Sequence, residues 1–517
     1  MRKILLFIGI FYLSAIAKDS FSQRYLTEVF PLVTKTSDVI YGNNISVMTG
    51  APAASDLKMD VYQPSGDVLT ERPLVIVLHT GSFLPPILNG QPTGSKNDSA
   101  VIEMCTRFAK KGYVAVAADY RLGWNPISTD VDVRTGTLLN AVYRAIQDTK
   151  NCVRFFKNDR ATTNAYKIDT TRIVVGGIST GGYISLAYAS LNQPSEIQLA
   201  KFIDNSKTPP VPYVNQALSG NFDGTDATQL NRSNYPSHNS KINMVFNVGG
   251  AIGDTSWIQA GEVPIISMHC TKDPFAPYKT GAVVVPTTGD FVVEASGSYD
   301  VIRTVNKAAI NNNAIFKNSL FNDVYTMRAN QLNNGSEGLF PFIMPAPGVA
   351  LPCGAQIEQG FPWDWWDQAA FIAQYNAATS TTNGAGANCK QLIGNPDMSA
   401  AKARKYIDSI QGYVCPRMVC ALNLPGCVPN GIKEYGDQSK VSVYPNPSTT
   451  EINFSVEGAN TIKNIRLYSI TGSLLFNVNG LNNNTYKLNR QTLPSGLYFL
   501  TIDLRDKASI TKKIILE

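Results

Sequence analysis

The chain has 517 residues, of which 44% are apolar and 16% are charged, so it is long enough to form two or more globular domains. Its formal net charge of +6 is small for this length, and the Lys and Arg residues form no basic tract. These features argue against nucleic acid as a partner.

The N-terminus has the pattern of a secretory signal peptide over residues 1–22. Met1–Lys3 supplies positive charge, and residues 4–17 are apolar and end in the small-residue pattern Ala15–Ala17. This run is shorter than the ~20 residues of a membrane-spanning helix, and no later segment is long and apolar enough to cross a bilayer. We therefore expect an exported protein without a transmembrane anchor.

Strand and helix patterns alternate after an irregular opening over residues 24–72. Leu74–Leu78 is continuously apolar, as expected for a parallel strand covered on both faces. A helix capped at residue 98 or 99 is predicted to reach Lys111. The later elements are a strand over 113–117, an amphipathic helix around 141–156, and strands over 172–175, 242–248 and 264–268. The alternation predicts a doubly wound, mostly parallel α/β sheet within a domain spanning residues 24–380.

Two segments rich in Asn, Pro, Ser and Thr, residues 191–240 and 276–360, interrupt this pattern. Such insertions over the carboxyl ends of strands commonly form lids and substrate walls. A helix over 366–377 is expected to close the sheet. Residues 381–440 are punctuated by Cys, Gly and Pro, and we interpret them as a Cys-containing appendage and linker.

The eight cysteines of an exported chain suggest disulfides rather than metal sites. Cys105 and Cys152 lie on two helices predicted to flank the same sheet, which makes them a reasonable pair. Connectivity stays open for the remaining six, Cys270, Cys353, Cys389, Cys415, Cys420 and Cys427. The late spacings lack the paired two-residue gaps of a zinc site, so neither a metal nor another cofactor is expected.

From residue 441 onward, short alternating apolar runs separated by turn residues predict a small antiparallel β-sandwich. Four motifs occur in order: Val443–Pro447, Leu467–Gly472, Leu493–Leu500 and Thr511–Leu516. They resemble the type A sorting domain of the bacterial type IX secretion system. The resemblance implies passage through the periplasm and across the outer membrane to the cell surface or the medium, with the type IX machinery as a partner.

The pentapeptide Gly177–Gly181 reads Gly-Ile-Ser-Thr-Gly, after a predicted strand and before a helix-like run. This context predicts a nucleophile elbow, in which Ser179 is held on a tight turn with its hydroxyl exposed. Acyl transfer by serine also requires a base, an acid that orients the base, and two amide donors for the oxyanion.

The oxyanion loop is predicted at His79–Phe83, directly after the first central strand. This segment resembles the His-Gly-Gly-Gly-Phe loop of carboxylesterases and lipases of the α/β-hydrolase superfamily. Asp119–Leu122 and Gln147-Asp148 add to the likeness, which covers residues 58–280. The resemblance implies that the amide of Gly81 or Ser82 pairs with that of Thr180, and that His79 is a structural residue of the loop. Thr80 and Ser82 stand where glycines are usual, which bears on the width of the pocket.

The segment Pro264–Asp273 resembles the strand and turn that place the aspartate of this superfamily. Asp273 is therefore the predicted acid, with Asp254 as the alternative.

The base is harder to assign, because these folds place the histidine after the acid and no histidine follows Asp273. The expected loop, Glu358–Trp366, offers carboxylates and aromatic residues but no imidazole. We assign His269 as the base, oriented by Asp254 or Asp273. His238 remains an alternative, as does a direct carboxylate base, Glu358 or Asp364, which needs burial to raise its pKa. The nearby aromatic residues, Phe361, Trp363, Trp365 and Trp366, are predicted to pack at the helix start or to wall the site.

Two hypotheses of different class follow. The first is an exported carboxylic-ester hydrolase that forms an acyl-enzyme on Ser179 and acts on an extracellular ester such as an acylated glycan, a lipid or a polyester fragment. The second is a catalytically degenerate α/β-hydrolase that serves as a cell-surface binding protein.

Overall fold

The computed structural model describes residues 24–87, 90–285, 289–351, 358–427, 441–457, 461–469, 473–490, 492–505 and 510–517. The chain divides into two compact units, Met1–Val428 and Pro429–Glu517. The predicted signal peptide and Cys353 lie outside the described residues. Within those residues, no helix combines the length and the hydropathy that a bilayer crossing requires.

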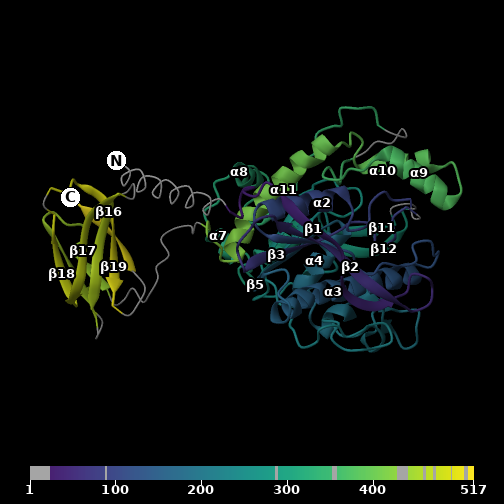
Figure 1. Ribbon diagram of the computed structural model, residues 1–517, viewed down its shortest axis with the longest axis horizontal. Coiled ribbons are helices and arrows are strands. Elements are labelled where there is room, and N and C mark those ends of the chain that lie inside the picture. The colour runs from purple at the N-terminus through teal and green to yellow at the C-terminus, as the bar shows by residue number, and fades with distance from the viewer. Residues whose placement is uncertain are drawn as a thin grey trace, which may run out of the picture. The chain divides into compact units, whose positions relative to one another are not determined.

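The first unit is built on an eight-stranded sheet with the order β1-β2-β4-β3-β5-β8-β10-β13 (Figure 1). Its strands are β1 (Val33–Ser46), β2 (Ala53–Pro64), β3 (Arg72–Leu78), β4 (Val114–Ala118), β5 (Ile168–Ile178), β8 (Met244–Val248), β10 (Ile265–Cys270) and β13 (Leu339–Phe342). The β1–β2 and β2–β4 pairs are antiparallel, and every pair from β4 to β13 is parallel. The predicted doubly wound, mostly parallel sheet is confirmed.

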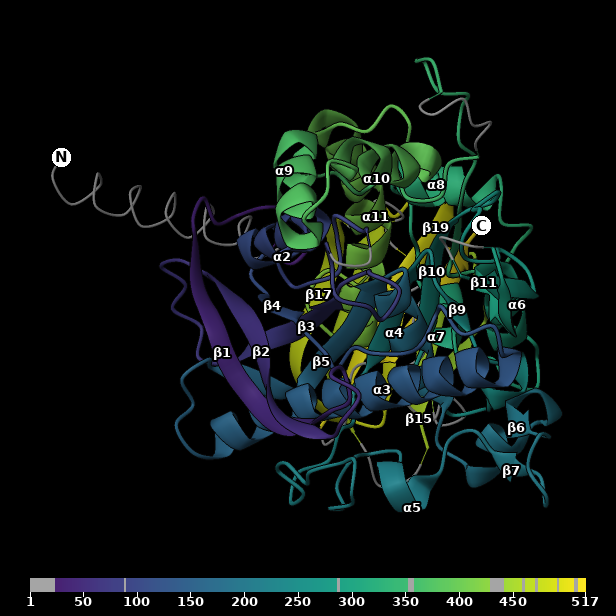
Figure 2. The same ribbon diagram turned by 90° about the vertical axis from the view of Figure 1, so that its right-hand side faces the viewer.

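Helices cover both faces of this sheet, which is why its central strands are continuously apolar. In β3, Leu74 and Ile76 belong to one core cluster, with residues of α3 (Val131–Ala161) and α4 (Thr180–Ser190). Val75 belongs to the other cluster, with residues of α2 (Ser99–Lys110) and α11 (Ala400–Ala421). Figure 2 shows α3 and α4 on one side of the strands and α2 and α11 on the other.

The predicted Cys105–Cys152 disulfide is wrong, because both thiols are free and buried. Cys105 lies on α2 and packs in the cluster on one face of the sheet, whereas Cys152 lies on α3 in the cluster on the other face. The sheet therefore separates two side chains that sequence patterning alone placed near each other.

The helix that covers the sheet late in the chain is α11, not the one predicted over 366–377. That predicted helix forms as α9 (Gln368–Thr379), but Phe371 is its only buried residue. By contrast, α11 buries Ile407, Ile410 and Val414 against the core. Residues 381–427, interpreted from the sequence as an appendage, therefore supply part of the core. Their frequent Cys, Gly and Pro residues hid the helical periodicity of the apolar positions.

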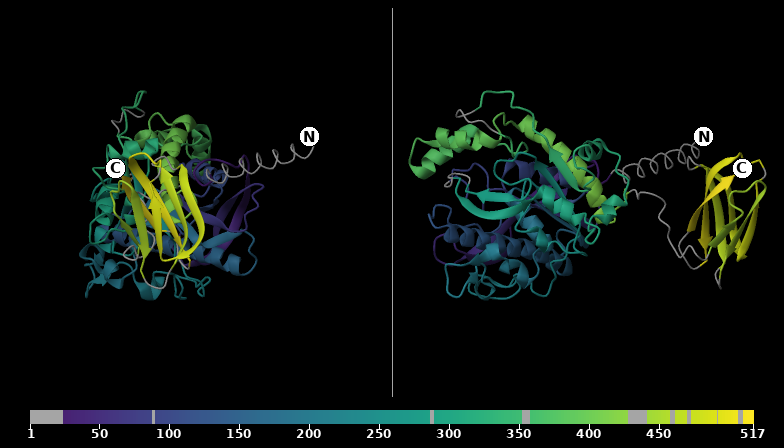
Figure 3. Two further views of the ribbon diagram at one scale, coloured as in Figure 1. Left: turned by 90° about the vertical axis from the view of Figure 1, so that its left-hand side faces the viewer. Right: turned by 180° about the vertical axis from the view of Figure 1, so that it is seen from behind.

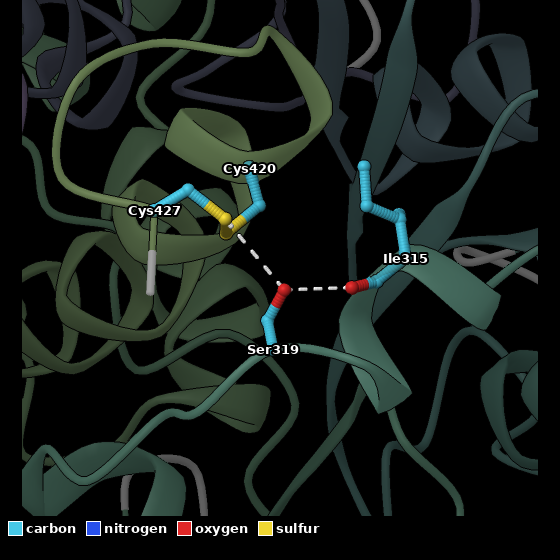
Figure 4. The surroundings of a disulfide bond; sticks show 4 residues. All are labelled: Ile315, Ser319, Cys420 and Cys427. Carbon is cyan, nitrogen blue, oxygen red and sulfur yellow. Dashed lines mark hydrogen bonds between the residues drawn. A yellow bond between two sulfur atoms is a disulfide. The ribbon is translucent and has the colours of Figure 1, made fainter. Parts of the chain in front are cut away.

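A disulfide joins Cys420 near the end of α11 to Cys427 (Figure 4). The Ser319 hydroxyl donates to the carbonyl of Ile315 at 2.7 Å, and its oxygen lies 3.6 Å from Cys427 Sγ. This contact connects the end of α11 to the segment after α7 (Ala314–Lys317). Cys389 is also disulfide-bonded.

The two insertions consist of loops with short helices and strands. The first contains β6 (Ile203–Asp204), β7 (Val211–Pro212) and α5 (Gln216–Ser219). The second contains β11 (Gly281–Val284), β12 (Phe291–Gly297), α6 (Ser298–Val305), α7 and α8 (Val324–Asn330). Strand β12 pairs with β9 (Ala251–Ile252), which directly follows β8, so the β11–β12 hairpin is attached at the edge of the sheet where β5 and β8 end. The short α10 (Gly384–Gln391) packs beside α9.

The second unit is a small antiparallel β-sandwich, as predicted (Figure 3). One sheet has the order β14-β15-β18 and the other β17-β16-β19-β20. Alternate residues such as Ile452, Phe454 and Leu467 fill the space between them. The strands are β14 (Val441–Tyr444), β15 (Glu451–Val456), β16 (Ile462–Ser469), β17 (Leu474–Asn483), β18 (Thr485–Asn489), β19 (Gly496–Leu504) and β20 (Ile510–Leu516).

If α11 belongs to the core, truncating one of its buried side chains must destabilise the first unit. Ile410→Ala is expected to lower the free energy of unfolding by about 2–5 kcal/mol, because a fully buried side chain is replaced by a cavity. Urea denaturation of residues 24–428 measures the change. The exposed Lys405→Ala on the same helix is the control and should change stability by less than ~0.5 kcal/mol. Equal stability of the two variants would show that α11 is peripheral.

Candidate active site

Ser179 occupies the turn between β5 and α4 with φ 52° and ψ −111°. A non-glycine residue in such a conformation costs on the order of 1–3 kcal/mol and persists only where its surroundings hold it. Here the amide of Ser179 donates to the carbonyl of Val248 at 2.8 Å, and the carbonyl of Ser179 accepts from the amide of Tyr183 at 3.0 Å. The predicted elbow is therefore formed, with Ser179 at its apex.

The two glycines of the pentapeptide are required by close backbone contacts. A Cβ on Gly177 would lie 2.2 Å from the carbonyl carbon of Gly181, and a Cβ on Gly181 would lie 2.4 Å from the carbonyl oxygen of Leu78. The amide of Gly181 also donates to the carbonyl of His79 at 3.1 Å. The elbow is thus packed directly against the end of β3 and the loop that follows it.

That loop holds Gly81, Ser82 and Phe83 at φ values of 115°, 53° and 55°. The Ser82 carbonyl accepts from Trp124 Nε1 at 2.7 Å, which anchors the loop. Within the described ranges, the amides of Gly81, Ser82 and Thr180 donate to no acceptor. The predicted oxyanion loop and the elbow thus present unpaired backbone donors on both sides of Ser179.

Ser179 and Ser82 line two cavities. The larger one, of about 910 Å³ including space open to solvent, is mostly apolar. Its walls come from α3, the first insertion, the segment after β8 and the β11–β12 hairpin, and include Leu139, Val142, Phe202, Trp257, Val283 and Val293. The second cavity, of about 670 Å³, has more polar walls, which include Gln91, Thr93, Asp273, Asp364 and Gln391.

Of the two candidate acids, the structure brings Asp273 to this place and leaves Asp254 outside it. Asp273 follows β10 and lines the second cavity together with Ser179. Its Oδ1 accepts from the amides of Phe275 and Ala276 at 2.8 and 3.0 Å. Asp254 lines neither cavity and pairs with Lys201 at 2.7 Å.

The structure places His269 beside Asp273 rather than beside Ser179. Its ring is fully buried, with Nδ1 2.7 Å from the Ser298 hydroxyl and Nε2 3.5 Å from Asp273 Oδ2. His269 lines neither of the cavities that Ser179 lines. Because both ring nitrogens face other groups, this geometry suits a residue that positions Asp273 and does not support His269 as the base.

The other two histidines are also away from the Ser179 hydroxyl. His238 precedes β8, at the amino end of the parallel strands, whereas Ser179 lies at their carboxyl ends. His79 stacks on Tyr120 with ring centroids 4.2 Å apart, and its Nδ1 lies 2.6 Å from the carbonyl oxygen of Thr80. Burial lowers the pKa of His79. All three histidines of the chain are described, and none lines either cavity.

The two carboxylate alternatives differ sharply in environment. Glu358 has a side chain that is 56% exposed and pairs with Lys272 at 2.9 Å. Asp364 is 5% exposed and lines the second cavity with Ser179 and Asp273. Among the described residues neither oxygen of Asp364 accepts a hydrogen bond, and Oδ1 is buried without a partner. Burial raises the pKa of Asp364 to about 7.

The aromatic cluster serves both purposes considered from the sequence. Trp363 is buried against the core, while Trp363, Trp366 and Phe361 also line the second cavity. Trp366 Nε1 donates to Asn388 Oδ1 at 2.9 Å, which links this wall to α10. In the part of the chain that the structure describes, no three His, Cys, Asp or Glu side chains form a metal-binding group.

The strand order, the strained serine on the turn after β5 and the aspartate after β10 define an α/β-hydrolase. Residues 59–285 match the family model described as BD-FAE, and residues 442–517 match that of the secretion system C-terminal sorting domain. The chain therefore combines an esterase-like α/β-hydrolase domain with a sorting domain of the type IX kind.

Individual relatives are remote. A non-reducing polyketide synthase of Stereocaulon alpinum is 25% identical over 193 residues, which are 37% of this chain and 6% of that protein. A structure of Thermogutta terrifontis esterase 2 phosphorylated by paraoxon is 18% identical and has a TM-score of 0.29, with 48% of this chain and 74% of that chain covered. A bifunctional GH43-CE protein of Bacteroides eggerthii is 17% identical with a TM-score of 0.29, over 47% of this chain and 31% of that one. Likeness at these TM-scores supports no further conclusion.

The burial of Asp364 predicts a specific pH dependence of stability. Its pKa is raised in the folded state, so the stability it contributes is complete at low pH and is lost as pH rises from about 4 through about 7. Asp364→Asn should not lose stability in this pH range, because its side chain does not ionise. Between pH 4 and pH 8 the variant should gain on the order of 4 kcal/mol relative to the wild type.

Urea denaturation at both pH values measures this difference. The control is Asp56→Asn, which changes an exposed aspartate and should shift stability equally at both pH values. A constant difference between Asp364→Asn and the wild type would mean that Asp364 is solvated.

Proposed function

We propose that this protein hydrolyses carboxylic esters through an acyl-enzyme on Ser179. The observation that carries the proposal is the Ser179 elbow, whose serine opens on two cavities and is flanked by unpaired backbone amides. Ser179 acts as the nucleophile, and the amides of Thr180 and of Gly81 or Ser82 hold the oxyanion. Asp273 is the acidic member of the site, and His269 positions it.

In the proposed reaction, Ser179 Oγ attacks the ester carbonyl carbon and the carbonyl oxygen becomes negatively charged. Backbone amides held in place before the reaction stabilise such a charge without reorganising, and a single donor of this kind contributes about 10²–10³ in kcat. The alcohol then leaves, and water releases the acid from Ser179. The strained backbone of Ser179 supports this role, because it keeps the hydroxyl at the mouth of the cavities.

The two cavities suggest what kind of ester fits. The larger cavity accepts an apolar group on one side of the ester bond, and the second cavity accepts a more polar group on the other. The sorting domain directs the enzyme to the cell surface or the medium, so the substrate is an extracellular ester.

A second candidate, a binding protein without turnover, is favoured by one observation. None of the three histidines lines a cavity of Ser179, so the usual imidazole base is missing from the site. Loss of a general base typically costs ~10²–10⁴ in rate.

Covalent labelling separates these two functions. Wild-type protein should react with a fluorophosphonate probe and hydrolyse p-nitrophenyl esters. Ser179→Ala should lose both activities completely, because the substitution removes the hydroxyl that forms the covalent bond. The exposed Ser237→Ala serves as the control and should keep both. The proposed hydrolase activity would be refuted if Ser179→Ala were still labelled by the probe. It would also be refuted if folded wild-type protein neither reacted with the probe nor hydrolysed any ester.

Narrowing the apolar cavity should change selectivity for chain length. Val142→Phe places a larger side chain in the cavity wall, so kcat/KM for octanoate relative to acetate esters should fall at least about 10-fold. The matched control is Val133→Phe on the same helix, where the residue is 39% exposed and lines neither cavity. An unchanged ratio of octanoate to acetate kcat/KM in Val142→Phe would show that the apolar group of the ester does not bind in this cavity.

A further inference from the structure

We propose that the carboxylate of Asp364 is the general base for Ser179, in place of an imidazole, with one water in their shared cavity relaying the proton. This inference rests on the proposed ester hydrolysis, and it names the group that makes turnover possible without histidine.

Asp364 and Ser179 line the same cavity, which has a volume of about 670 Å³. No hydrogen bond joins the two side chains in the described part of the chain, and the cavity is large enough to hold a water between them. General-base catalysis can act through one such water.

The turn around Asp364 is held by hydrogen bonds. The amide of Asp364 donates to the carbonyl of Phe361 at 3.1 Å. Asn395 Nδ2 donates to the carbonyls of both Phe361 and Asp364 at 3.0 Å. The neighbouring Trp363 is buried in the core. These contacts hold the backbone of Asp364 in place at the wall of the cavity.

The carboxyl group of Asp364 is unpartnered among the described residues although it is buried. A structural aspartate at 5% exposure is normally satisfied by donors, since an unpaired buried carboxylate is costly. Asp364 has no such donor among the described residues. Burial also raises the pKa of Asp364 to about 7, close to that of an imidazole, which is the range in which a general base works best near neutral pH.

The neighbouring groups leave this role to Asp364. Asp273 has its Oδ1 engaged by two amides and its Oδ2 facing His269.

Asp98, at the start of α2, accepts hydrogen bonds from the amides of Gly94 and Ser95, and its pKa is raised by burial and by the charge of Asp364. From α11, Lys402 donates to Gln359, Asn395 and Asp397 rather than to Asp364. Burial is what raises the pKa of Asp364, and no cation pairs with it in the described chain.

In the proposed reaction, one proton at a time passes between Ser179, a water and Asp364. As Oγ of Ser179 bonds to the ester carbonyl carbon, its proton passes to the water, which passes a proton to Asp364. Asp364 returns that proton by the same route to the departing alkoxide when the carbon–oxygen bond to the alcohol breaks. A second water then attacks the acyl-enzyme and gives a proton to Asp364, and Ser179 recovers it as the carboxylic acid leaves.

The test compares wild type, Asp364→Asn and Asp364→Ala with p-nitrophenyl esters between pH 5 and pH 9. Wild-type kcat/KM should rise with pH through about 7 and then level off. At pH 8, Asp364→Asn should lower kcat by about 10²–10⁴ with little change in KM, and the rise with pH should disappear. Glu358→Gln, an exposed carboxylate on the same loop, is the matched control and should keep the wild-type profile.

Added formate separates a catalytic role from a structural one. Formate should restore activity to Asp364→Ala in a saturable manner, because a small carboxylate can enter the space left by the side chain. If Asp364→Asn retains kcat within threefold of wild type with the same pH profile, or formate restores nothing to folded Asp364→Ala, the inference fails while Ser179-dependent turnover still supports the enzyme. If wild type shows no Ser179-dependent turnover, the proposed function fails and the inference fails with it.

Discussion

The site depends on the close approach between the elbow and the end of β3. Gly181 lies against the carbonyl of Leu78, and the amide of Ser179 bonds to the carbonyl of Val248. These contacts join the carboxyl ends of β3, β5 and β8, which meet at one edge because the strands are parallel. The strained conformation of Ser179 persists because three strands and α4 hold it. The oxyanion loop and both cavities take their positions from this junction.

Around that junction, two carboxylates occupy one cavity in contrasting environments. Asp273 accepts hydrogen bonds from backbone amides, and its Oδ2 lies 3.5 Å from His269 Nε2. Asp364, by contrast, is buried without a donor in the described residues. Enzymes assign acid and base roles to two chemically identical groups by placing them in different environments. The proposed base role of Asp364 rests on this contrast, since burial raises its pKa to about 7 and no histidine lines either cavity.

The cysteines of the described residues fall into two groups, buried free thiols and disulfide-bonded residues. Four thiols in the described residues are free, Cys105, Cys152, Cys270 and Cys415; all are buried, and burial raises the pKa of each. A protonated, inaccessible thiol resists oxidation and disulfide exchange, so these residues act as small apolar core side chains. The disulfide between Cys420 and Cys427 instead secures the end of α11, the last helix before the sorting domain.

The sequence by itself determined the features that depend on neighbouring residues. The apolar strand at Leu74–Leu78, the elbow at Ser179 and the alternating strands of the sorting domain all follow from local periodicity and turn chemistry. Three features were decided only by the tertiary structure: the sheet that separates Cys105 from Cys152, the packing of α11 onto the core, and the burial of Asp364 beside Ser179. Each joins segments that are far apart in the chain, and the raised pKa of Asp364 arises from desolvation by residues that no local pattern around it contains.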